Sequence, residues 1–135
     1  MTTITTDNTF TSKYQLSAPH SEVVAAAATM THGRALDLGC GSGRNTLYLN
    51  QLGFDVTAWD KNADSIATLD RIIAAESLSG ISSAIHDLNQ LRFNGAYDLV
   101  FSTVAMMFLQ PETIPQLIAD MQASTKKYGY NLIVA

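Results

Sequence analysis

Apolar and polar positions follow two different rhythms along the chain, and the two rhythms alternate. Short stretches with the apolar or alternating pattern of strands lie at 34–38, 54–59, 81–85, 97–102 and 130–134. Stretches with apolar residues every three or four positions, typical of helices, lie at 21–30, 43–52, 63–75 and 112–124. This alternation predicts an α/β fold with a mostly parallel, Rossmann-like sheet and right-handed crossovers. We expect the strand order 3-2-1-4-5.

The turn after the first predicted strand carries the clearest chemical signal. Asp37 stands two residues before Gly39, and further glycines follow at Gly41 and Gly43. Glycine reaches backbone angles that a Cβ forbids, and it lets a ligand lie against the main chain. A dinucleotide-binding turn would have its third glycine at position 44, which is Arg44. The pattern therefore favours a ligand with an amino group and a positive sulfur facing the carboxylate; a turn without a ligand is the alternative.

Two more carboxylates follow predicted strands. Asp60 ends the second strand, 21 positions after Gly39, and an acidic residue at this separation accepts hydrogen bonds from ribose hydroxyls. Capping of the next helix is an alternative role that can coexist with it. Asp87 follows the third strand, where it could accept the adenine amino hydrogen while the N–H of Leu88 donates to the ring; an ordinary loop residue is the alternative. We expect all three carboxylates to face one cleft.

The carboxyl end of the fourth strand should complete this cleft, because open α/β sheets bind ligands at that edge. Ser102, Thr103 and Val104 leave the sheet there and are expected to line the methionine end of the ligand. Trp59 and Lys61 flank the ribose carboxylate. The tryptophan is either part of the core or a wall beside the adenine.

Composition sets the class of protein and of partner. With 135 residues, 47% hydrophobic and 15% charged, the chain predicts one globular domain at 13–135 after a mobile, Thr-rich segment at 1–12. The net charge of −4 is scattered, so we expect a small-molecule substrate and no nucleic acid. The chain has one cysteine, no long apolar run and no signal-peptide pattern, which predicts a cytoplasmic protein without membrane contact. The histidines lack metal-ligand spacing, so no metal is predicted.

Several phrases together resemble a known family. They are Leu36-Asp37-Leu38-Gly39-Cys40-Gly41, Gly43-Arg44-Asn45, Trp59-Asp60-Lys61-Asn62 and Asp87-Leu88-Asn89. The glycine motif alone resembles the S-adenosylmethionine (SAM) signature of class I methyltransferases, and the other phrases make the chain similar to the tellurite-resistance methyltransferase family, TehB. This resemblance implies a cytoplasmic SAM-dependent enzyme that methylates tellurite, selenite or a similar small acceptor and releases S-adenosylhomocysteine (SAH).

The resemblance and the fold together assign a set of cofactor contacts and leave the catalytic residues unknown. The expected cofactor contacts are Asp37, Gly39, Cys40, Gly41, Gly43, Arg44, Asn45, Trp59, Asp60, Lys61, Asp87, Leu88, Ser102, Thr103 and Val104.

The chain also departs from the family. The family's Pro-Gly-Gly turn before the fifth strand reads Lys127-Tyr128-Gly129 here, and the helix and antiparallel hairpin that follow this strand in class I methyltransferases are missing. The chain therefore resembles a C-terminally truncated cofactor-binding portion. One alternative is a SAM-binding module without turnover that self-associates through the bare strand 130–134. The other is an NAD-dependent dehydrogenase.

Overall fold

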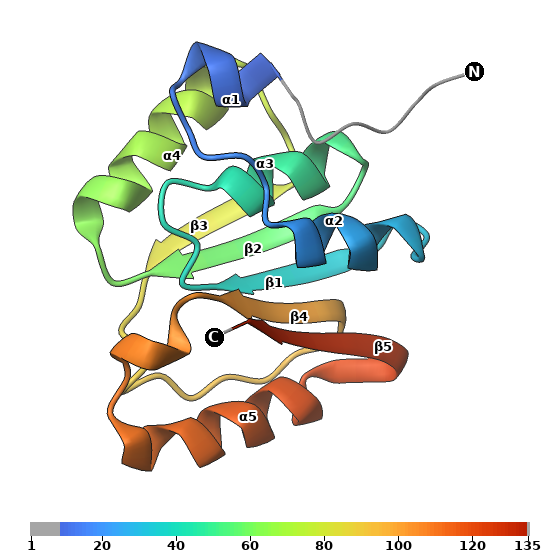
Figure 1. The fold of residues 1–135 in the computed structure, drawn as a ribbon, viewed down its shortest axis with the longest axis vertical. Helices are drawn as coiled ribbons and strands as arrows, with labels where there is room; N and C mark the ends of the chain where they lie inside the picture. Colours follow the sequence, from blue (N-terminus) through green and yellow to red (C-terminus); the bar gives the residue numbers. More distant parts are fainter. Residues whose placement is uncertain (1–8, 135) are drawn as a thin grey trace.

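Five parallel strands form one sheet at the centre of the computed structural model, which describes residues 9–134 (Figure 1). The strands are β1 (Arg34–Leu38), β2 (Asp55–Asp60), β3 (Ile81–Ile85), β4 (Tyr97–Thr103) and β5 (Thr125–Val134). Their order is β3-β2-β1-β4-β5, which confirms the predicted topology. All four pairings among the described strands are parallel.

Helices cover both faces of this sheet. They are α1 (Thr9–Lys13), α2 (Ser21–Ala28), α3 (Arg44–Gln51), α4 (Ala63–Ala75), α5 (Ile114–Ala123) and the 3-10 turns η1 (Met106–Phe108) and η2 (Pro111–Thr113). Figure 1 shows α1 beside α4 at one end of the molecule and α5 beside β4 and β5 at the other. The α4 bounds agree with the predicted helix, because its apolar stripe fixes both ends.

Strand β1 shows why the sheet needs helices on both sides. Its residues from Ala35 to Leu38 are fully buried, as expected of a central parallel strand. Ala35 packs in a core with α2 and α3, whereas Leu36 and Leu38 pack in a core with Leu117 of α5. Alternate side chains of one strand thus supply two cores.

A third core ties the start of the described chain to α4. Phe10 of α1 is 6% exposed and packs in the cluster that contains Leu69. Lys13 forms an ion pair of 2.7 Å with Glu76 just after α4, and the Tyr14 hydroxyl donates to the same carboxylate. The segment predicted to be mobile was 1–12. Its residues 1–8 lie outside the described residues, and its residues 9–12 belong to α1.

The last strand differs from its prediction. We expected a turn before a strand at 130–134, but β5 already begins at Thr125. Its register with β4 jumps between two pairs, Tyr97 with Thr125 and Leu99 with Tyr130. The residues between these pairs form a bulge, because β5 advances five positions while β4 advances two. The polar and glycine signals that predicted a turn correspond to this bulge, where Tyr128 has φ +69°.

Candidate cofactor site

The glycine turn between β1 and α3 is bound to the end of β2. The Gly39 and Cys40 N–H groups both donate to the Trp59 carbonyl, at 2.8 and 2.9 Å. The Gly41 N–H donates to the Asp60 carboxylate at 2.8 Å. Gly39 has φ +79°, and a Cβ there would lie 2.7 Å from the Cβ of Ala105. Both the backbone angle and the close approach therefore require glycine at this position.

One hollow opens beside this turn at the carboxyl edge of the sheet, and we call it the carboxylate cleft. It has a volume of about 320 Å³ and is lined by Gly39, Gly41, Asp60, Lys61, His86, Asp87, Leu88, Val104, Ala105, Phe108 and Leu109. Its size falls within the range of small-molecule sites. Seven of the predicted cofactor contacts line it, from the turn, from the ends of β2 and β4, and from the segment after β3.

A second hollow of about 340 Å³ lies on the other side of the turn. It is lined by Gln15, Leu16, Ser17, Gly39, Cys40, Gly41, Ser42, Arg44, Asn45 and Thr103. The first residues of α3 form hydrogen bonds to the segment that follows Ser17 on the rim of this hollow. Arg44 donates to the Ala18 carbonyl at 3.1 Å, while the Asn45 side chain accepts from the His20 N–H at 2.8 Å and donates to Thr103 at 3.1 Å. The glycine turn is thus a wall between two hollows.

Asp60 is held in the carboxylate cleft by main-chain donors. One carboxylate oxygen accepts from the Gly41 N–H and the other from the Asn62 N–H, each at 2.8 Å. The N-cap of α4 is Asn62, whose side chain accepts from two amides of the first turn. A carboxylate offers about four lone-pair sites. Each oxygen of Asp60 therefore keeps acceptor capacity toward the cleft, which fits a vicinal diol.

Asp87 and Leu88 present a donor and an acceptor side by side. One oxygen of Asp87 accepts from the Asn89 N–H at 2.9 Å. The Leu88 N–H has no acceptor among residues 9–134. A base edge with an amino group beside a ring nitrogen would match this pair, because it offers a donor and an acceptor in the complementary order.

The third predicted carboxylate lies behind the cleft. Asp37 is fully buried and lines neither hollow. Thr46 of α3 donates to one of its oxygens at 2.7 Å, and the other oxygen has no partner among the described residues. Burial raises the pKa of Asp37 to about 7, although the Thr46 hydrogen bond acts in the opposite direction. The structure thus brings Asp60 and Asp87 together and leaves Asp37 beneath the turn.

Three other predicted contacts also line neither hollow, namely Gly43, Trp59 and Ser102. The Trp59 ring packs edge-on against His86 at 5.0 Å between ring centroids and against Phe93 at 5.7 Å. Trp59 packs against a buried core cluster, whereas its neighbour His86 lines the carboxylate cleft. Burial raises the pKa of the Cys40 thiol, so this cysteine is not a reactive thiolate.

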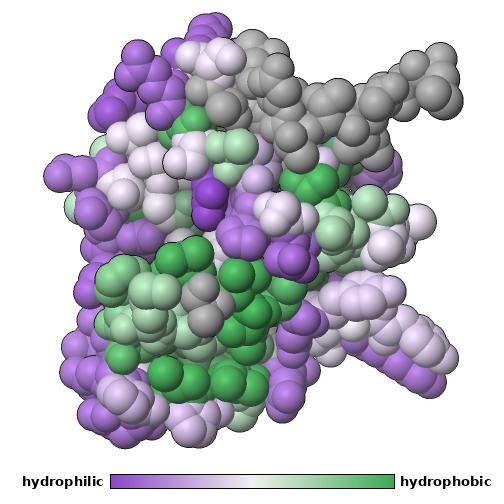
Figure 2. Space-filling view, in the orientation of Figure 1, coloured by the Kyte–Doolittle hydropathy of each residue, from purple (hydrophilic) through white to green (hydrophobic). Residues whose placement is uncertain are grey.

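Residues that the sequence did not assign to the cofactor also shape the site. In the carboxylate cleft they are His86, Ala105, Phe108 and Leu109. His86 could have been inferred from its place directly before Asp87. The sequence suggests Phe108 as an apolar wall beyond the fourth strand and Phe108-Leu109 as a family phrase, whereas Ala105 carries no such signal. Figure 2 shows apolar side chains gathered over the carboxyl ends of β4 and β5 and over η1. Val104, Met107 and Phe108 are exposed there, at 39%, 59% and 70%, which gives the cleft an apolar rim.

Within residues 9–134, no group of three or more His, Cys, Asp or Glu side chains could hold a metal ion. In the same part of the chain, no helix combines the length and the apolar character needed to cross a bilayer.

A parallel sheet of this order, with a glycine turn after β1 and carboxylates at the end of β2 and after β3, is the Rossmann-like arrangement of class I methyltransferases, which the structural match to TehB bears out. The family described as tellurite resistance protein TehB matches residues 2–135. The chain belongs to this family.

Known proteins similar to the chain agree with this assignment. A probable S-adenosyl-L-methionine-dependent methyltransferase TehB from Haemophilus influenzae is 48% identical over 93% of this chain and 44% of its own length. The crystal structure of TehB from Haemophilus influenzae matches with a TM-score of 0.87 and 47% identity over 92% of this chain and 43% of that one. The glycopeptide N-methyltransferase MtfA with SAM matches with a TM-score of 0.72 at 21% identity, over 84% of this chain and 48% of its own, which shows the fold alone. The chain spans less than half the length of the Haemophilus influenzae TehB relatives it matches.

Proposed function

We propose that this chain forms the SAM-binding part of a TehB-type methyltransferase. The observation that supports it most directly is the carboxylate cleft, where Asp60 and Asp87 face one hollow beside the bare main chain of Gly39 and Gly41. These groups fit the cofactor's chemistry: carboxylate oxygens for the ribose diol, and the Asp87 acceptor beside the Leu88 N–H for the adenine edge. An NAD-dependent dehydrogenase is less well supported, because Arg44 occupies the third-glycine position.

Other members of the predicted set are assigned to the methionine end. Arg44, Asn45 and Thr103 line the second hollow, on the far side of the same turn. One oxygen of the buried Asp37 carboxylate has no partner among residues 9–134, and its charge would attract the cofactor's ammonium group. A buried acceptor without a donor is what remains where a water or a ligand completes the network.

The proposed reaction needs placement more than acid–base chemistry. SAM supplies a methyl group on a positive sulfur; the methyl–sulfur bond breaks as the methyl–acceptor bond forms, and the sulfur keeps the electron pair as a neutral thioether. The chain's residues bind and orient the donor and exclude water from it. A tellurite or selenite oxyanion brings its own lone pair, so no general base is required. We propose such an acceptor from the family, and a cytoplasmic location from the sequence.

Calorimetric titration with SAM and with NAD tests the cofactor. We expect binding of SAM and none of NAD. Asp60→Ala should weaken SAM binding by at least about tenfold, since each hydrogen bond to a charged group contributes about 1.5–3 kcal/mol and tenfold corresponds to about 1.4 kcal/mol. Asp55→Ala is the matched control, because this exposed carboxylate starts the same strand that Asp60 ends. Equal SAM affinity in the two variants would remove Asp60 from the site.

Methyl transfer itself is tested with labelled SAM and tellurite, on this chain and on a TehB protein of full family length. Label in a methylated tellurium oxyanion from both proteins supports an active chain. Label only with the longer protein supports the alternative of a cofactor-binding module without turnover.

We also propose that the chain self-associates through β5, with a second copy as the partner. Its exposed side chains include Tyr128, Tyr130 and Ile133, and a strand edge without a neighbour is a template for pairing. In an antiparallel pair of β5 strands, the basic residues at 126 and 127 would lie opposite the apolar end of the partner strand, so like charges stay apart. Ile133→Lys should make the protein monomeric in light scattering at high concentration. The control is Ile85→Lys on the opposite edge strand, and a monomeric unchanged chain would refute this proposal.

A further inference from the structure

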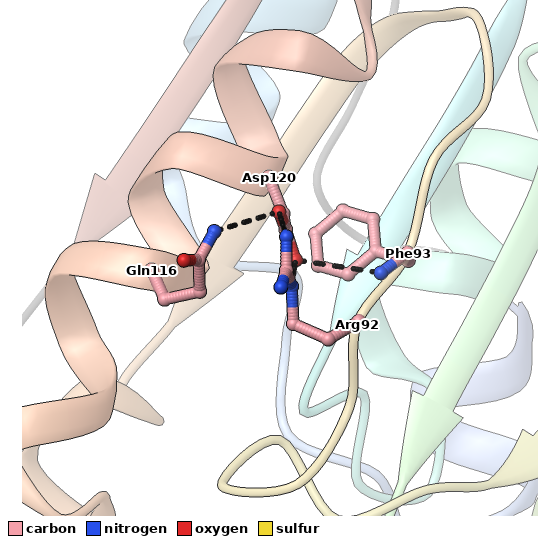
Figure 3. Close-up of polar contacts among 4 residues, drawn as sticks. All are labelled: Arg92, Phe93, Gln116 and Asp120. Carbon is pink, nitrogen blue, oxygen red and sulfur yellow. Dashed lines mark hydrogen bonds and ion pairs between the residues drawn. The ribbon is translucent and has the colours of Figure 1, made fainter.

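A polar cluster on α5 fixes the loop that runs from β3 to β4. Asp120 lies on the sheet-facing side of α5 and is 5% exposed. Figure 3 shows its carboxylate between Arg92, Phe93 and Gln116. Arg92 donates to it twice, at 2.9 and 3.1 Å, and the Gln116 amide donates at 3.1 Å. The Phe93 N–H also donates, at 3.4 Å. All of the neighbours are donors, so this buried charge is well satisfied.

The carboxylate, rather than the guanidinium, is the fixed member of this pair. The Arg92 side chain is 68% exposed, whereas that of Asp120 is 7% exposed. Arg92 can therefore return to water if the pair is broken, and the loop that carries it is then released. The hydrogen bond from Arg92 holds the pKa of Asp120 below its ordinary value of 3.8, so the carboxylate stays charged at neutral pH.

The same loop has a second attachment nearer to the cleft. The Asn89 side chain accepts from the Gln110 N–H at 2.8 Å and from the Thr113 hydroxyl at 3.1 Å, at the two ends of η2. The segment between this attachment and β3 contains His86, Asp87 and Leu88, which line the carboxylate cleft. The η2–α5 segment thus sets where these lining residues stand.

Aromatic contacts connect the α5 cluster to the cleft wall directly. Phe93 packs edge-on against Trp59, with centroids 5.7 Å apart and planes at 75°. Trp59 packs in the same manner against His86, at 5.0 Å and 75°. Such edge-to-face pairs stabilise a defined ring geometry beyond simple burial. A shift of Phe93 would therefore move the tryptophan and, with it, the histidine on the cleft wall.

We propose that Asp120 is a positioning residue that sets the selectivity of the carboxylate cleft for adenine. This inference rests on the proposed SAM-binding function. The Asp87 carboxylate accepts an amino hydrogen from adenine, whereas hypoxanthine would place a carbonyl oxygen against it. A site built to hydrogen-bond one group rejects an analogue that lacks it, provided that the site holds its geometry. Asp120 holds that geometry by fixing the loop and the stack of Phe93, Trp59 and His86.

Two variants and one control test this role. Asp120→Asn removes the negative charge to which Arg92, Phe93 and Gln116 donate. Arg92→Met breaks the ion pair from the other side, and because Arg92 is exposed, this change carries little risk for folding. Asp98→Asn is the control, because Asp98 also forms an ion pair, 3.4 Å from Lys126, but lies near the amino end of β4. Trp59 is the only tryptophan in the sequence, so protein emission reports on the stack in the absence of any ligand.

Emission and selectivity are then measured on the same samples. In both variants we expect Trp59 emission to shift to longer wavelength and to become more accessible to iodide. We also expect the preference for SAH over S-inosylhomocysteine to fall at least about fivefold, which corresponds to the loss of about one hydrogen bond. The control should keep both properties.

Three results would count against the proposal or its basis. Unchanged emission and unchanged preference in both variants would overturn it. An equal loss of affinity for both ligands, with the preference retained, would also overturn it, because a merely structural residue gives that result. Failure of the unchanged chain to bind SAH would refute the proposed SAM-binding function, and with it the selectivity role; Trp59 emission would then still decide whether Asp120 holds the aromatic stack.

Discussion

Replacing the buried carboxylate of Asp37 by an amide should stabilise the protein, and the gain should grow with pH. Asp37→Asn keeps the shape of the side chain and an oxygen that can accept from Thr46. It removes the charge that burial disfavours. The raised pKa means that the folded state retains a proton that the unfolded state has already lost. Stability contributed by protonated Asp37 is therefore complete at acid pH and is lost as the pH rises from the unfolded to the folded pKa.

The magnitude follows from the two pKa values. A rise from 3.8 to about 7, at about 1.36 kcal/mol per pKa unit, amounts to up to about 4 kcal/mol once both states are ionised. The same relation gives about 1 kcal/mol at about pH 4.5 and about 4 kcal/mol at about pH 7.5. The free energy of unfolding of Asp37→Asn relative to the unchanged chain should therefore increase by about 3 kcal/mol over this range.

Urea unfolding of both proteins at the two pH values measures this difference, and other titrating groups cancel because both proteins contain them. A difference in unfolding free energy that does not vary with pH would refute the reasoning, since it would mean that Asp37 is ionised in the folded state at a normal pKa. SAM titration of the same proteins adds a second readout. If the charge attracts the cofactor's ammonium group, the more stable variant binds SAM more weakly.

Two further predictions concern the backbone. Tyr128→Gly should be more stable than Tyr128→Ala by about 1 kcal/mol in thermal unfolding, because residue 128 has φ +69° and only the Cβ differs between the variants; equal melting temperatures would contradict this. Gly39→Ala should lower the free energy of unfolding by about 2–4 kcal/mol, since φ +79° and the approach of Ala105 both oppose a Cβ. Gly41→Ala, whose Cβ would meet nothing within 4 Å, should cost only about 1–2 kcal/mol in the same assay, and an equal loss in both would show that the approach of Ala105 is not important.

The fold followed from the sequence wherever one pattern was strong. The residues of β1, β3 and α4 were predicted with correct bounds, because an apolar run or a helical stripe ended at a clear polar or glycine signal. The start of β5 was missed for the opposite reason. Its polar residues and Gly129 have the composition of a turn, yet the chain stays paired with β4 through a bulge. Composition alone does not distinguish a turn from a bulged strand.

The site was predictable to the level of strand ends and no further. Asp60 and Asp87 lie in one cleft because the carboxyl ends of neighbouring parallel strands meet at one edge of the sheet. Side-chain direction was not predictable: Asp37 lies under the turn, facing Thr46. The pair of Arg92 and Asp120 joins residues that are far apart in sequence and share no motif, so only the folded chain reveals it.

The amides of the glycine turn have consequences for how this region can change. Three consecutive N–H groups, from Gly39 to Gly41, donate hydrogen bonds to the last two residues of β2. One hydrogen bond lies within the turn, from the Gly43 N–H to the Cys40 carbonyl at 3.1 Å. These three bonds to β2 therefore outnumber it. Sliding β2 by a single residue would release all three anchors at once, even if every glycine were kept. Insertions or deletions in the α3–β2 connection should therefore be as damaging as changes in the motif. A mutant library that varies only the turn residues would not sample the β2 residues that accept these hydrogen bonds.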